Sequence, residues 1–254
     1  MNNKLFELIN NKKVVVVGAA DYLQYKNIDN IIDKYDVVVR INRGTRLQDK
    51  KGYGSRTDVL YHCLCQKTGG KLTPEIYNKY KIIVGAIPPL YPLDKDVKNS
   101  SFPNTYIHMY NSIPKYYSNK FTCVNKIDFL KLENDIGCRP YTGVITIYHL
   151  LKQKPAELYI TGMTFGKGGT NSIYKKDNTI QDWINHEKNA GYPKSHDNYL
   201  IWLYTKEMIK NSETKIILDQ ELKEILEFDI EKYRKRLNMD NLTDKEIYIH
   251  YLLN

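Results

Sequence analysis

Short apolar runs alternate with helical patterns along most of the chain, and this alternation predicts the fold. The strand-length runs lie at 14–17, 37–41, 58–61, 82–86, 158–161 and 215–218, and the helical patterns at 27–34, 142–152, 196–210 and most of 219–254. Continuous apolar strands separated by helices are typical of a parallel sheet that is covered on both faces. We therefore expect an α/β fold, a three-layer α/β/α sandwich with a mostly parallel, Rossmann-like sheet in a single domain at 1–254.

Two stretches interrupt this pattern. Residues 87–118 combine prolines with tyrosines, and residues 163–195 are rich in Gly, Lys and Asn. Connections longer than about 15 residues are usually functional loops or disordered segments. We expect residues 163–195 to form an active-site loop or lid, and residues 219–254 to form a helical carboxyl-terminal part.

The composition narrows the class of protein. Aromatic residues make up 12% of the 254 residues, which gives enough apolar surface for folding. No apolar run is long enough to span a membrane, and residues 1–4 lead straight into a strand without the apolar core of a signal peptide. We expect a cytoplasmic protein with reduced thiols, because disulfide and zinc spacings are absent from its cysteines, Cys63, Cys65, Cys123 and Cys138.

The formal net charge of +9 indicates an anionic partner. Nucleic acid, a phosphorylated small molecule and a membrane surface all fit this charge. The lysines are scattered, however, whereas nucleic-acid binders usually gather them on one face. The abundance of Lys, Asn and Ile, with 22 Tyr against 6 Phe, indicates drift toward A/T-rich codons. We therefore expect no nucleic-acid partner and leave peripheral membrane contact open.

Small and polar residues stand where predicted strands end. Gly18 and Ala19 follow the first strand and Asn42 ends the second, positions where parallel sheets bind ligands. The absence of G-x-G-x-x-G disfavours NAD and FAD, and Gly18 serves equally well as a simple turn glycine. Arg40 and Arg56 suit either a phosphate or a buried ion pair.

Several of these segments resemble motifs of the eukaryotic-type sialyltransferases, glycosyltransferase family 29. The first strand with Gly18, the Asp-x-Val-x-Arg-x-Asn pattern ending at Asn42, and the Gly-Ser-Arg-Thr run containing Ser55 resemble the large motif. The segment from Arg139 to Gly162, with Tyr141-Thr142-Gly143, resembles the small motif. The short motif has a counterpart in His196-Asp197 with Glu207, and the third is met loosely by residues 183–187, which contain His186.

The resemblance implies a soluble, divergent member with a variant GT-A type fold. It implies an inverting, metal-independent transfer of sialic acid from a CMP-sugar to a hydroxyl of a glycan or glycolipid acceptor. The start of the helix at Thr142 offers backbone N–H groups and a positive dipole end for the donor phosphate. The donor-binding residues expected on this basis are Gly18, Ala19, Asn42, Ser55, Tyr141, Thr142, Gly143 and Gly162.

Two histidines are the candidate catalytic residues. We expect His196 to be the base that takes the acceptor proton, since its ordinary pKa lies near working pH. We assign His186 to neutralising the departing phosphate, although it also fits an exposed loop histidine beside Glu187.

Three departures keep alternatives open. Ala19 replaces the asparagine usual in the family, and neither the family's cysteine pair nor its membrane anchor is present. These differences fit a cytoplasmic relative, and they leave the donor open between sialic acid and a related keto-acid sugar such as Kdo. A catalytically silent CMP- or glycan-binding protein is the alternative function. We interpret the Asp94-Lys95-Asp96 run as a solvated turn and expect no cofactor or metal.

Overall fold

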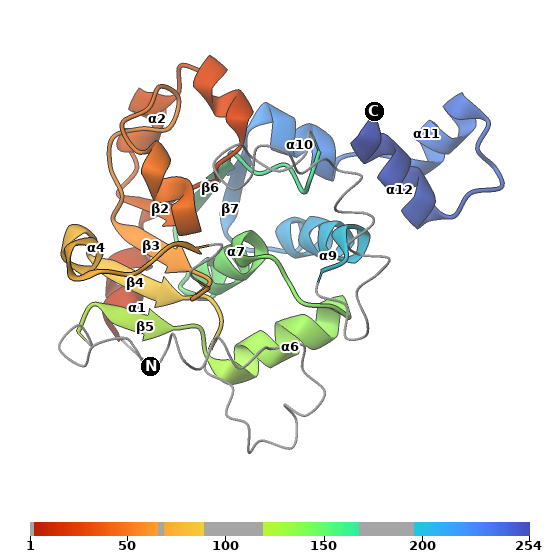
Figure 1. Cartoon of the computed structure of the whole chain (residues 1–254). Coiled ribbons are helices and arrows are strands. Elements are labelled where there is room, and N and C mark those ends of the chain that lie inside the picture. The colour runs from red at the N-terminus through yellow and green to blue at the C-terminus, as the bar shows by residue number, and fades with distance from the viewer. Residues whose placement is uncertain (1–2, 66–68, 89–118, 168–195) are drawn as a thin grey trace.

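In the part of the chain that the structure describes, seven parallel strands form one sheet in the order β5-β4-β3-β2-β1-β6-β7. The computed structural model describes residues 3–65, 69–88, 119–167 and 196–254 (Figure 1). The strands are β1 (Lys13–Val17), β2 (Val37–Ile41), β3 (Val59–His62), β4 (Ile82–Gly85), β5 (Phe121–Cys123), β6 (Glu157–Thr161) and β7 (Lys215–Leu218).

Helices cover both faces of the sheet and give three layers. They are α1 (Asn3–Ile9), α2 (Asp29–Asp33), α4 (Pro74–Lys79), α6 (Lys126–Ile136), α7 (Thr142–Lys152), α9 (Asn198–Lys210), α10 (Gln220–Leu226), α11 (Ile230–Leu237) and α12 (Asp244–Leu253), with short 3-10 helices η1 (Asp21–Tyr25) and η2 (Asn42–Leu47). In Figure 1, α11 and α12 lie beyond α9 and α10, away from the sheet. The fold is therefore the predicted α/β sandwich.

Alternate side chains of each strand enter different cores, which explains why the strands are apolar throughout. Val14 and Val16 of β1 join the larger core with α6, α7 and α9, whereas Val15 and Val17 pack with Leu23 of η1 on the other face. The inner strands β1, β2, β3, β4 and β6 are thus buried on both sides, as parallel strands between helices are, whereas the edge strands β5 and β7 are only partly buried. The register places Val16 beside Val39 of β2 and Ile160 of β6.

Five of the helices begin at a side chain that caps them, whereas the starts of α2, α4 and α7 have no side-chain cap. Asn125, Asp197, Asp219, Asp229 and Thr243 each accept a hydrogen bond from a backbone N–H in the first turn of α6, α9, α10, α11 and α12, respectively. Such caps satisfy N–H groups that have no partner within the helix. In α12 the cap is a full capping box, in which Glu246 also returns to the backbone of Thr243.

Three sequence predictions differ from the structure. The chain enters helix α1 before its first strand, so the expectation that residues 1–4 lead straight into a strand is wrong. Strand β5 was not predicted, because three residues are too few for a period to register. The helix expected at 27–34 is the shorter α2, which leaves the rest of that segment irregular.

Two further findings bear on the expected class of protein. Within the residues that the structure describes, no helix is both long and apolar enough to cross a membrane. Cys63, Cys65, Cys123 and Cys138 are free thiols. The cytoplasmic location itself stays a prediction.

Two buried histidines make stability depend on pH. Burial lowers the pKa of His62 and His149 to about 4 from an ordinary 6.5, and His149 Nδ1 lies 2.9 Å from the Tyr61 hydroxyl. Between pH 6.5 and 4 the unfolded chain therefore binds more protons than the folded chain. Stability should fall as pH falls through this window, by about 1.4 kcal/mol per pH unit for each histidine once both unfolded histidines are protonated.

Urea unfolding of the wild type at several values between pH 7 and pH 5 measures this slope. In the variant His149→Gln, the part of the fall in unfolding free energy that comes from these histidines should be about half as large, because only His62 then contributes. A wild-type free energy of unfolding that stays flat across this range would contradict the assignment.

Candidate functional site

The strand order reverses next to β1, and this places a ligand position at one edge of the sheet. The chain steps from β1 outward through β2, β3, β4 and β5, and then β6 returns to the opposite side of β1. In open parallel sheets, ligands bind outside the carboxyl ends of the strands at such a switch point. Gly18 follows β1 and Gly162 follows β6, so both residues lie at this position.

The backbones at Gly18 and Gly162 touch each other. Gly18 N donates to Thr161 O at 2.8 Å, and Ala20 N donates to Gly162 O at 3.1 Å, which extends the β1–β6 pairing past the strands. A Cβ on Gly18 would lie 2.0 Å from Gly162 O. Gly162 itself has φ +73, which favours glycine. Both glycines are thus required by the fold at this point, whatever binds there.

Helix α7 begins beside this edge without a side-chain cap. Its N-cap residue, Tyr141, makes no capping hydrogen bond, in contrast to the capped starts of α6, α9, α10, α11 and α12. Tyr141, Thr142 and Gly143 are partly exposed. The first N–H groups and the positive end of the helix dipole are therefore suited to an anion.

Gly143 connects the start of α7 to the strand ends. A Cβ on Gly143 would lie 3.5 Å from Sδ and Cε of Met163, the residue after Gly162, and 3.8 Å from Cδ1 of Ile41 at the end of β2. Ala19, which follows Gly18, lies near Gly44 of η2: a Cβ added to Gly44 would be 3.8 Å from the Cβ of Ala19. The structure thus brings together the predicted residues that follow β1, β2 and β6 and those that open α7.

Asn42 is buried and joins β2 to β3. Its φ is +50, a left-handed conformation that asparagine tolerates better than most residues. Its Oδ1 accepts a hydrogen bond of 2.8 Å from Cys63 N. The acceptor side of the amide is thus used within the fold, and the Nδ2 donor is the group that Asn42 can offer a ligand.

His196 lies against the start of α7. Its Nδ1 is 2.8 Å from Arg139 O, and its ring centroid is 4.5 Å from that of Tyr141. A carbonyl can only accept, so Nδ1 carries the proton in this hydrogen bond. In the neutral ring the lone pair is then on Nε2, which is the state that a general base requires.

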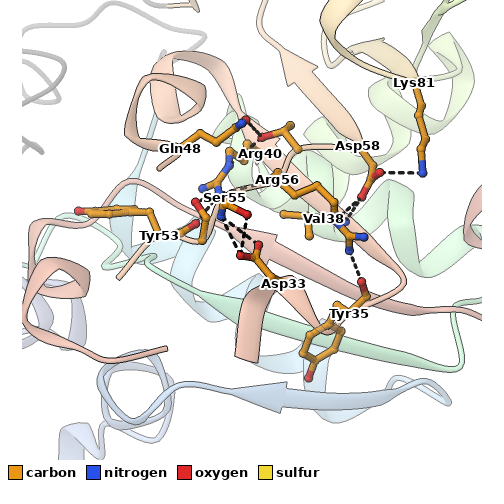
Figure 2. Close-up of polar contacts among 12 residues, drawn as sticks. Asp33, Tyr35, Val38, Arg40, Gln48, Tyr53, Ser55, Arg56, Asp58 and Lys81 are labelled. Atoms are coloured by element: carbon orange, nitrogen blue, oxygen red, sulfur yellow. Dashed lines mark hydrogen bonds and ion pairs between the residues drawn. The ribbon is translucent and has the colours of Figure 1, made fainter. Parts of the chain in front are cut away.

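The structure places Ser55 away from this group. Its N–H and hydroxyl donate to the Asp33 carboxylate, at 3.0 and 2.9 Å (Figure 2). Asp33 and Ser55 each precede a strand, β2 and β3, respectively, and so lie toward the amino ends of the strands, opposite the site. Ser55 therefore lies apart from the other predicted donor-binding residues.

The two arginines have structural partners. Arg40 is fully buried and donates to Thr57 Oγ1 at 2.8 Å and to the carbonyls of Tyr53, Gly54 and Arg56. Burial lowers the pKa of Arg40 to about 10, so it keeps its charge at neutral pH. Arg56 pairs with the Asp58 carboxylate at 3.3 Å (Figure 2). The structure thus gives both arginines partners within the fold: Arg40 is buried among hydroxyl and carbonyl acceptors, and Arg56 forms a partly exposed ion pair.

Sequence reasoning missed a buried carboxylate at the switch point. Asp219 follows β7, and its Oδ2 accepts from Tyr22 Oη at 2.5 Å, Thr161 Oγ1 at 2.6 Å and Gly162 N at 2.9 Å. Its Oδ1 caps α10 through Leu222 N at 2.8 Å. These bonds fix the turn at Gly162. A polar residue directly after a predicted strand was the signal that could have revealed it.

Part of the predicted site lies outside the described residues. His186 with residues 183–187, the Asp94-Lys95-Asp96 run and most of the expected lid at 163–195 belong to this part. In the described ranges, no cluster of three or more His, Cys, Asp or Glu side chains could hold a metal ion.

Comparison with solved structures finds sialyltransferases. CstII of Campylobacter jejuni in complex with CMP-3FNeuAc matches at 16% identity and a TM-score of 0.52, covering 82% of this chain and 81% of that chain. The monofunctional alpha-2,3-sialyltransferase Cst-I of the same organism matches at 14% and 0.52, covering 84% and 78%. This chain has the fold of these sialyltransferases. A mammalian sialyltransferase in complex with Gal-beta-1-3GalNAc-ortho-nitrophenol also matches, at 18% and 0.50, covering 84% and 71%.

The sequence itself gives no such match. No family model and no curated protein matches the chain. The likeness to sialyltransferases therefore concerns the fold.

Proposed function

We propose that this protein is an inverting glycosyltransferase of the family 29 sialyltransferase type. It moves sialic acid, or a related keto-acid sugar, from a CMP-sugar to a hydroxyl of a glycan or glycolipid, without a metal. The observation that carries the proposal is the position of His196, whose Nδ1 is bound to Arg139 O beside the uncapped start of α7. A base and an anion-binding helix end thus lie side by side at the edge where this fold takes ligands.

The two parts have complementary roles in such a transfer. The first N–H groups of α7 hold the CMP phosphate and stabilise the charge that develops on it as the sugar leaves. His196 Nε2 takes the proton from the acceptor hydroxyl as its oxygen attacks the anomeric carbon. The bond between that carbon and the phosphate oxygen breaks, and CMP leaves on the opposite side. Asn42 Nδ2 and the backbone near Ala19 contact the nucleoside, and His186 is the candidate partner of the departing phosphate.

A ligand panel tests the donor class. Thermal shifts with CMP, UDP, GDP, NAD and S-adenosylmethionine should show selective stabilisation by CMP, because a ligand that binds only the folded state raises its apparent stability. Transfer from CMP-sialic acid is then measured with and without EDTA, and we expect the same rate in both. CMP binding with no turnover on any acceptor would favour the silent binding protein, and stabilisation by another nucleotide would contradict the proposal.

The variant Gly143→Ala tests the place of the phosphate. The added methyl has space, since its nearest neighbours, two atoms of the Met163 side chain, would be 3.5 Å away, and alanine favours helix over glycine by about 1 kcal/mol. We expect an unchanged or higher melting temperature together with CMP affinity reduced by about tenfold, because the methyl crowds the N–H groups of α7.

The control for this experiment is Lys152→Ala, which changes an exposed residue in the last turn of the same helix. It should bind CMP like the wild type, because it lies at the end of α7 opposite to the proposed phosphate. If Gly143→Ala binds CMP as tightly as Lys152→Ala does, the phosphate does not lie at the start of α7.

A further inference from the structure

His196, Asp197 and Asn198 lead into α9 and contact two parts of the chain that are distant in sequence. His196 contacts Arg139 O and the Tyr141 ring, and the Tyr141 hydroxyl donates to Asn198 Oδ1. Between them, Asp197 forms an ion pair with Lys245 of α12. The candidate base therefore lies between the start of α7 and the carboxyl-terminal helix.

Asp197 is placed so that it depends on Lys245. Its side chain is only 3% exposed, and its Oδ1 accepts from Leu200 N at 3.1 Å as the cap of α9. The other oxygen, Oδ2, makes the ion pair with Lys245. A carboxylate buried to this degree requires a cation or several donors, and removing its partner forces it to move toward water.

Aromatic stacking fixes helix α12 against α9 and against the segment that follows α10. Its Tyr248 stacks on Trp202 of α9, with ring centroids 4.6 Å apart, and Tyr251 stacks on Phe228 at 3.8 Å. Lys167 Nζ lies 3.7 Å from the Tyr251 ring centroid. Helix α12 thus contacts the chain on both sides of residues 168–195, at Lys167 and at Asp197.

We propose that Lys245 is a positioning residue, whose ion pair with Asp197 fixes the start of α9 and the orientation of the His196 ring. The proposal rests on the proposed function, in which His196 is the base. The ion pair holds Asp197, Asp197 fixes the backbone next to His196, and Nδ1 then stays on Arg139 O with Nε2 ready for the acceptor. Displacing a reacting group by about 1 Å can cost up to about a hundredfold in rate.

The test compares Lys245→Met, Lys245→Arg and Asp197→Asn with the wild type. Lys245→Met should lower kcat by about tenfold or more and leave the donor KM and the CMP affinity within about twofold, because the phosphate site at α7 is intact. Lys245→Arg keeps the cation and should restore most of kcat. Asp197→Asn keeps a side chain that caps α9 but loses the ion pair, so it should reproduce the loss even if Lys245→Met does not fold.

The matched control is Arg234→Met. Arg234 braces α11 against α12 through Asp244 and the carbonyl of Leu242, and it does not contact Asp197. It should lower the melting temperature while kcat stays near that of the wild type. An equal loss of kcat in Arg234→Met and Lys245→Met, or wild-type kcat in folded Lys245→Met and Asp197→Asn, would overturn the proposal.

A spectroscopic measurement separates this inference from the proposed function. In ¹⁵N-histidine spectra, the wild type should show His196 protonated at Nδ1, and His196→Gln identifies the signal. Lys245→Met should replace it with a mixture of tautomers. If the protein transfers no sugar but this change occurs, the positioning inference holds and the proposed function fails; an unchanged His196 signal in both Lys245→Met and Asp197→Asn overturns the inference alone.

Discussion

His196→Ala is expected to lower the rate of sugar transfer by about a hundredfold or more, since general-base catalysis contributes about 10² to 10⁴. The hydrogen bond from Nδ1 to Arg139 O leaves Nε2 as the basic nitrogen, and the variant removes both. CMP binding should change little, because the phosphate is held by the start of α7. The measurement is kcat for transfer, together with CMP affinity by calorimetry.

Two further variants make this result specific. His196→Gln keeps a side-chain N–H that can still donate to Arg139 O but has no basic nitrogen, so it should lose activity like the alanine variant. His250→Gln, on α12, removes a histidine that the proposed chemistry does not use, and it should transfer normally. Wild-type transfer by His196→Ala would mean that another group is the base.

Gly18→Ala is expected to destabilise the protein by about 3 kcal/mol, at the upper end of the cost of overpacking a close contact. Its Cβ would lie 2.0 Å from Gly162 O and 2.6 Å from Gly162 C, and both are backbone atoms that no rotamer change can move. The β1–β6 pairing must therefore open at the switch point. At about 2–4 °C per kcal/mol for a chain of this size, the melting temperature should fall by about 6–12 °C.

Gly44→Ala is the matched control for stability. The nearest atom to its added Cβ would be Ala19 Cβ at 3.8 Å, which is an ordinary van der Waals distance. Its free energy of unfolding, measured in urea, should stay within about 1 kcal/mol of the wild type. Equal stability of the two variants would mean that the backbones at Gly18 and Gly162 are not packed as described.

The candidate-site residues that the sequence could predict are those next to a strand or at the start of a helix. Gly18, Asn42 and Gly162 each follow a run of apolar residues, and Thr142 and Gly143 open a helix whose period is plain in the sequence. Their shared position follows from parallel strands, whose carboxyl ends lie at one edge. The sequence also suggested His196 at a helix start, and the structure places it two residues before α9.

Ser55 shows what sequence spacing alone does not reveal. The segment between β2 and β3 begins at the carboxyl edge, where the Tyr53 hydroxyl donates to Ala20 O at 2.8 Å. It then reaches Asp33 near the amino ends, where Ser55 is bound. The motif fits the large motif of the resembled family, but its spacing alone does not reveal to which edge each residue belongs.

The apolar pattern by itself determined the class of fold, six of the seven strands in the described residues and the start of α7. It could do so because burial and helical period are local properties, visible in the residues of each segment. Only the tertiary structure decided that β6 lies beside β1, that Asp219 holds the turn at Gly162, and that Lys245 reaches Asp197 from 48 residues away. Such contacts depend on how distant segments pack together. This packing buries apolar surface from the whole chain at once, so no single segment of the sequence is enough to predict it.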